Sequence, residues 1–144
     1  MIEKDTIRLL RECDAGVKMG IESIDDVRDY VRDEKFRDLL VTCKREHETL
    51  EREIESELNR FSDEGKEPSP IAETMSKLKT EFKLRMKEED ATVASLMTDG
   101  CNMGVKSLHR YLNQYSAAEE KAKDIAKRLI NLEEKLAVDI RSYL

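Results

Sequence analysis

Apolar side chains recur every three or four residues along most of the chain, and this spacing places them on one face of an α-helix. Each apolar stripe can be covered only by the other stripes, so the sequence predicts an all-α four-helix bundle. We expect a single domain over 1–144. The predicted long helices cover about 3–31, about 34–61, about 90–115, and a last segment that follows Ser116 and extends to about Tyr143.

The middle of the chain is predicted to hold a loop and a short helix. Both prolines lie between Ser62 and Pro70, where they favour a loop. Apolar residues at helical spacing follow and predict an extra short helix in the middle connection. Its apolar positions are Ile71, Met75, Leu78, Phe82 and Met86.

Three short polar segments mark the expected helix boundaries. Asp33 is predicted as the break between the first two helices. Asp90 is predicted to cap the third helix, because an aspartate accepts hydrogen bonds from free amides of a first turn. Ser116, with Glu119 three residues later, is predicted to form a capping box for the fourth.

Two segments of the chain repeat. Gly16-Val-Lys-Met-Gly20 resembles Gly100-Cys-Asn-Met-Gly104, which lies 84 positions later. His47 and Leu50 match Glu133 and Leu136, which lie 86 positions later. The repeat predicts two helical hairpins related by a pseudo-two-fold axis.

Equal rise along paired helices places the repeated glycines near particular side chains of their hairpin partners. We expect Gly16 and Gly20 at the level of His47, and Gly100 and Gly104 within one turn of Glu133. A glycine inside a helix costs roughly 1 kcal/mol relative to alanine, so these glycines need a reason. Close helix packing and a small ligand cavity are both open interpretations.

Composition narrows the classes of function. The net charge is −6, with acidic and basic residues interspersed, which argues against nucleic-acid binding. The start of the chain is charged and no long apolar run occurs, so we expect a cytoplasmic protein without a membrane partner. The cysteines, at 13, 43 and 101, are too widely spaced for a zinc site and are predicted to be small buried apolar residues.

Cys13-Asp-Ala-Gly16 and Thr98-Asp-Gly100, together with the repeated hairpins, resemble the ferritin-like superfamily. More narrowly, the chain resembles a bacterial ferritin-like four-helix-bundle family of unknown function. In ferritin-like dimetal enzymes, one Glu comes from each of two helices and a Glu-x-x-His from each of the other two.

The chain departs from that dimetal ligand set. His47 stands where a ligand histidine would, but Lys44 precedes it by three residues. In the fourth helix Glu133 replaces the histidine and Ile130 the glutamate. We therefore expect a non-catalytic bundle with no catalytic or cofactor-binding residue, in which His47 is hydrogen-bonded to a carboxylate or a backbone group, with Glu133 as the expected partner.

Other interpretations stay open at this point. An atypical iron or manganese site could be formed by His47, Glu133, Glu22 and Glu48. An interaction or structural module is favoured, with a second copy or another protein as partner. Four apolar side chains could cover such a partner or close the bundle end beneath the short helix: Tyr111, Tyr115, Phe82 and Met86.

Overall fold

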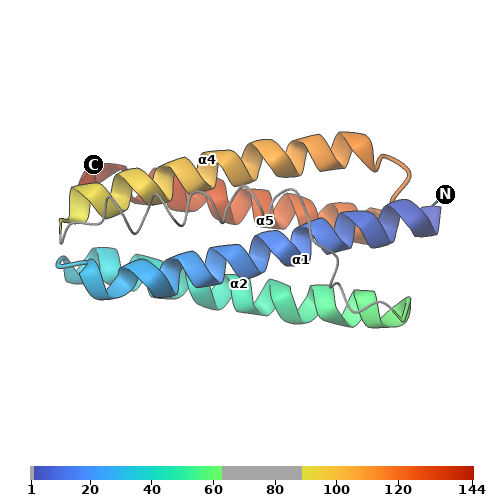
Figure 1. The fold of residues 1–144 in the computed structure, drawn as a ribbon, viewed down its shortest axis with the longest axis horizontal. Helices are drawn as coiled ribbons and strands as arrows, with labels where there is room; N and C mark the ends of the chain where they lie inside the picture. Colours follow the sequence, from blue (N-terminus) through green and yellow to red (C-terminus); the bar gives the residue numbers. More distant parts are fainter. Residues whose placement is uncertain (1, 63–88) are drawn as a thin grey trace.

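The computed structural model describes residues 2–62 and 89–144, which form a bundle of four long helices (Figure 1). No β-strand occurs in these two ranges, so the predicted all-α fold is confirmed for them. The predicted short helix, with Phe82 and Met86, lies outside the described residues. The long helices are α1 (Ile2–Val27), α2 (Glu34–Arg60), α4 (Asp90–Gln114) and α5 (Glu120–Asp139), and two 3₁₀ turns are η1 (Arg28–Tyr30) and η2 (Arg141–Tyr143).

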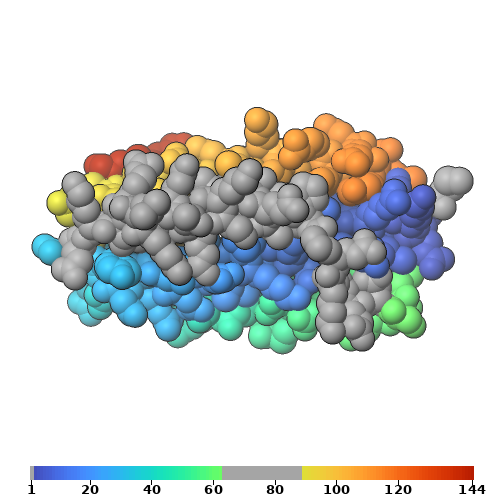
Figure 2. Space-filling view, viewed as in Figure 1, coloured from blue at the N-terminus to red at the C-terminus, as the bar shows by residue number. Residues whose placement is uncertain are grey.

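The helices pair as two antiparallel hairpins, α1 with α2 and α4 with α5 (Figure 1). α2 and α4 run in the same direction, and α1 and α5 run in the opposite one. α5 also packs against both α1 and α2, and α1 packs against α4. The 26 residues of α1 extend over about 39 Å, which gives the bundle the elongated outline of Figure 2.

The turn of the first hairpin is closed by the start of the second. α1 ends at Val27, earlier than predicted, and Asp33 caps α2 by accepting a hydrogen bond from the Phe36 amide. Asp90 is not an N-cap, because α4 begins at this residue. Its carboxylate instead accepts hydrogen bonds from the amides of Arg32 (2.7 Å) and Asp33 (2.9 Å).

The turn of the second hairpin is closed by the start of the first. The predicted capping box at Ser116 is wrong, since α5 begins only at Glu120. The acceptors come from α1: Asp5 accepts from the Ala117 amide (3.1 Å) and the Thr6 hydroxyl accepts from the Glu119 amide (2.8 Å). Each hairpin therefore closes the turn of the other.

Among residues 2–62 and 89–144, the apolar core consists of two clusters, one toward each end of the bundle. On every long helix these clusters are separated by a gap near the middle. Gly20, His47, Gly104 and Glu133 lie in these gaps, one on each helix, and we call them the central polar layer. The first cluster includes Leu9–Val17, Leu50–Leu58, Leu108–Tyr111 and Ala122–Ile130, and the second includes Ile24–Val31, Phe36–Cys43, Val93–Cys101 and Leu136–Ile140.

Tyr111 and Tyr115 pack within the bundle. Tyr111 is buried in the first cluster, and its ring stacks on Tyr115 with centroids 6.0 Å apart. This pair therefore contributes to intramolecular packing at the end of the bundle. None of the helices within the described ranges combines the length and apolar character that crossing a bilayer requires.

Candidate functional site

His47 lies against Gly20 in the central polar layer. The ring is 2 % exposed, and a Cβ atom added to Gly20 would lie 2.8 Å from both Nε2 and Cδ2. Any side chain on α1 at this position would therefore collide with the imidazole. The predicted proximity of Gly20 and His47 is confirmed, and the glycine makes room for a polar side chain.

Glu133 and Gly104 make the corresponding contact in the second hairpin. A Cβ atom at Gly104 would lie 1.9 Å from Oε2 of Glu133, so the carboxyl group occupies the space that a side chain would fill. The other two repeated glycines behave differently: Gly16 would make only an ordinary 3.6 Å contact with Leu129, and Gly100 would meet nothing within 4 Å.

The imidazole of His47 is oriented by its own helix. Nδ1 donates a hydrogen bond to the carbonyl oxygen of Cys43, one turn earlier, at 2.8 Å. The carbonyl can only accept, so the neutral ring carries its proton on Nδ1. Of the two predicted partners, the backbone group is correct, and within the described residues no hydrogen bond joins His47 to Glu133. Burial lowers the pKa of His47 and favours the uncharged ring.

Glu133 is a strongly perturbed carboxyl group in the central polar layer. It is 8 % exposed, and its buried Oε2 has no hydrogen-bond partner. Burial raises the pKa of Glu133 to about 8, because the apolar surroundings disfavour the charged form. The carboxyl group is therefore mainly protonated at neutral pH.

The three cysteines are buried and free, as predicted. Burial raises the pKa of the Cys13 and Cys43 thiols to about 12, and it raises that of Cys101 as well. Nucleophilic attack and metal coordination by cysteine require the thiolate. These thiols therefore act as apolar packing groups. Repulsion from the negative charge of an ionised Glu133 also contributes to the raised pKa of Cys43 and of Cys101.

The four candidate metal ligands do not come together as a set. His47 and Glu133 belong to the same layer, whereas Glu22 is exposed on α1 and Glu48 is half-buried on α2. Over residues 2–62 and 89–144, no three His, Cys, Asp or Glu side chains form a group that could hold a metal ion.

A groove between the first half of α2 and the last half of α5 is a second candidate site, and sequence reasoning did not identify it. Its volume is about 390 Å³. The buried Cys43 is one of its lining residues, and both cationic and anionic side chains line it. We call it the α2–α5 groove; its lining residues are Lys35, Asp38, Leu39, Thr42, Cys43, Glu46, Leu132, Lys135, Leu136, Asp139 and Tyr143.

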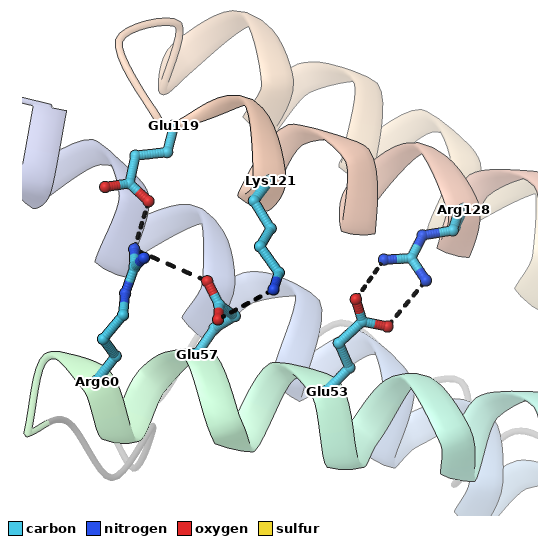
Figure 3. A network of polar contacts seen from close by, with 6 residues as sticks. All are labelled: Glu53, Glu57, Arg60, Glu119, Lys121 and Arg128. Atoms are coloured by element: carbon cyan, nitrogen blue, oxygen red, sulfur yellow. Dashed lines mark hydrogen bonds and ion pairs between the residues drawn. The ribbon is translucent and has the colours of Figure 1, made fainter.

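The other half of the α2–α5 interface is closed by ion pairs (Figure 3). Arg128 binds Glu53 through two hydrogen bonds of 2.6 and 2.8 Å. Glu57 lies 3.5 Å from Lys121 and 3.8 Å from Arg60, which also pairs with Glu119. Several of these pairs join the first hairpin to the second. The α2–α5 interface is thus ionic at one end and open at the other.

Comparisons with known proteins yield no relatives: no family model matches the chain, and neither the curated proteins nor the solved structures contain a match.

Proposed function

We propose that this chain is a non-catalytic ferritin-like bundle that acts as an interaction module, and that its binding site is the α2–α5 groove. The proposed partner is a second copy of the chain. The observation that carries the proposal is the open groove beside an otherwise ion-paired helix interface.

Helix order and repeated contacts support the ferritin-like part of the proposal. Bundles of this class join two antiparallel hairpins through one long connection, and α2 and α4 run parallel here. The contact of Gly20 with His47 recurs between Gly104 and Glu133, at sequence offsets of 84 and 86. The reciprocal closure of the two hairpin turns repeats in the same way.

Local chemistry in the central polar layer supports a non-catalytic role. A dimetal site needs inward-facing carboxylates on four helices and two histidines. Here the positions that face His47 and Glu133 are glycines. Lys44, three residues before His47, forms a 2.7 Å ion pair with Asp25, and Ile130, three residues before Glu133, is buried in the first apolar cluster.

The groove fits a second copy because its surface is self-complementary. A two-fold interface uses the same patch on both partners, so a patch that carries both charges can pair with itself. Lys35 and Asp38 supply both signs on α2, and Lys135 and Asp139 supply both on α5. Leu39 and Leu132, which also line the groove, provide apolar area for burial.

Light scattering of the full chain over a micromolar concentration range tests self-association. We expect a concentration-dependent dimer for the natural sequence and a monomer for Leu39→Arg, which places a charge in the groove. Val138→Arg is the matched control, because Val138 is 52 % exposed on α5 and does not line the groove. A monomer for the natural sequence at all concentrations would contradict the proposed partner, and a dimer of the Leu39→Arg variant would contradict the proposed surface.

Metal analysis of protein purified without chelators tests the non-catalytic assignment separately. We expect less than stoichiometric iron or manganese. Stoichiometric metal that is lost in His47→Ala, with helicity retained by circular dichroism, would replace the proposal with a metal-binding function.

A further inference from the structure

The carboxyl group of Glu133 is placed inside the bundle without an ionic partner. It lies in the interruption between the two apolar clusters and occupies the space left by Gly104 on α4. Its Oε2 atom is buried and accepts no hydrogen bond. Neighbouring amides of α4 are engaged in the helix, so the backbone beside Gly104 offers little to a charged group.

The titratable groups that face Glu133 inside the bundle are uncharged. Cys43 approaches from α2 and Cys101 from α4, and both thiols are protonated. His47 on α2 is a neutral ring directed at Gly20, which is the contribution of α1 to this layer. On α5 itself, Glu134 and Lys135 are exposed. Within the described residues, no cation faces the Glu133 carboxyl group.

A carboxylate without a cation or a donor is costly in such surroundings, whereas the neutral acid is tolerated. We propose that Glu133 is an internal proton-binding site, and that loss of its proton loosens the packing of α5 against α4. The ligand of this site is a proton, and the site works in the single chain, so it stands whether or not the bundle dimerises.

The packing of α5 against α4 should loosen because the ionised side chain of Glu133 would have to move toward water. The charged group is best solvated by water, and the largely buried position against Gly104 exposes only 8 % of Glu133. When the side chain swings out, it leaves an unfilled space between the two apolar clusters, and the helices around that space lose contacts. The central section of the bundle therefore opens more readily once Glu133 is ionised.

Titration of the side-chain carboxyl carbon of Glu133 by ¹³C NMR on the full chain is the direct test. The resonance of Glu133 is expected to stay in its protonated position through neutral pH and to move near pH 8. Above that pH, amides near Gly104 should exchange faster than base catalysis alone explains. A Glu133 resonance that has already moved by pH 6 would overturn the proposal, as would a titration near pH 8 with no change in exchange beyond base catalysis.

Two variants connect the proton to stability. Between about pH 6.5, above which His47 is neutral in both the folded and the unfolded state, and pH 8, the folding equilibrium constant of the natural sequence should fall by up to about tenfold per pH unit. Glu133→Gln should lose this dependence, whereas Glu134→Gln, the same change at the exposed neighbour, should retain it. Equal slopes in the two variants would contradict the assignment.

Gly104→Ala keeps the test decisive if Glu133→Gln fails to fold. The added Cβ collides with the end of a flexible side chain, which can move aside toward water. The titration midpoint of Glu133 should then fall toward that of an ordinary glutamate. An unchanged midpoint would show that the contact with Gly104 does not hold the proton.

Discussion

Arg128 on α5 binds Glu53 on α2 through two hydrogen bonds, one from each terminal nitrogen of the guanidinium group, and this contact joins the two hairpins (Figure 3). The guanidinium group lowers the pKa of Glu53 through the hydrogen bond and the attraction of its charge. Both side chains are partly exposed, so water and salt weaken the pair.

A double-mutant cycle with Glu53→Gln and Arg128→Met should give a coupling energy of about 0.5–1 kcal/mol at low salt. The coupling should shrink in high salt because the pair is partly exposed. Urea unfolding of the four proteins measures it. Glu120 and Lys123, which pair within α5 at 3.7 Å, provide the control cycle and should couple more weakly. A larger coupling in the control pair would argue against the bidentate geometry.

The contribution of the buried His47 ring to the free energy of unfolding should decrease in mild acid. Burial lowers the pKa of His47 below its ordinary value of 6.5, so the unfolded chain binds this proton more readily than the folded one. Above pH 6.5 both states are neutral and the contribution is fully present. As the pH falls below that value, the contribution of His47 to the free energy of unfolding should fall by up to about 1.4 kcal/mol per pH unit until the folded ring is protonated, against the opposite contribution of Glu133.

Urea unfolding between pH 5 and pH 8 measures how the free energy of unfolding depends on pH. Glu133 contributes the opposite slope equally in every protein compared, so the difference between the proteins reports on the histidine. His47→Gln should remove the acid-dependent part. His109→Gln is the matched control, because His109 is exposed on α4. If both variants retain the slope, another group is responsible.

The four repeated glycines should differ in their response to alanine. Gly100→Ala should stabilise the protein by about 0.5–1 kcal/mol, since its Cβ meets no atom within 4 Å and the helix propensity improves. Gly20→Ala drives its Cβ into the buried ring of His47 and should be about 1–3 kcal/mol less stable than Gly100→Ala. Thermal and urea unfolding rank the two, and equal stability would mean that the ring moves without cost.

Asp90 should matter more for stability than other acidic residues of α4. Asp90→Ala removes the acceptor for the amides of Arg32 and Asp33 and should cost about 1–2 kcal/mol. Hydrogen exchange at these two amides should accelerate more than at the middle of α2. Asp99→Ala, at an exposed position of the same helix, should change neither measurement.

Helical periodicity was sufficient to predict the four helices and the levels at which they meet. Equal rise per residue along paired helices predicts Gly20 at the level of His47 and Gly104 within one turn of Glu133, and the structure brings each of these pairs into contact. The backbone bond of His47 to Cys43 was only one of two predicted alternatives. A choice between them depends on the side-chain rotamer, which periodicity does not determine.

Features that depend on the approach of distant segments were not predictable in this way. The capping predictions at Asp90 and Ser116 considered only the next turn, whereas the partners lie 58 and 113 positions away in the chain. The groove and the pair of Glu53 with Arg128 depend on the rotation of α2 about its axis relative to α5. A stripe of apolar residues fixes that rotation too coarsely to pair individual charges.

The reciprocal hydrogen bonds at the two turns make the hairpins mutually dependent. Asp90 of the second hairpin accepts hydrogen bonds from the turn of the first. At the opposite end, Asp5 and Thr6 of the first hairpin accept hydrogen bonds from the turn of the second. A polypeptide severed between the halves would leave both bends with dangling amides until its fragments met. Each fragment supplies the acceptors that the turn of the other lacks. The two fragments should therefore bind each other and become ordered together.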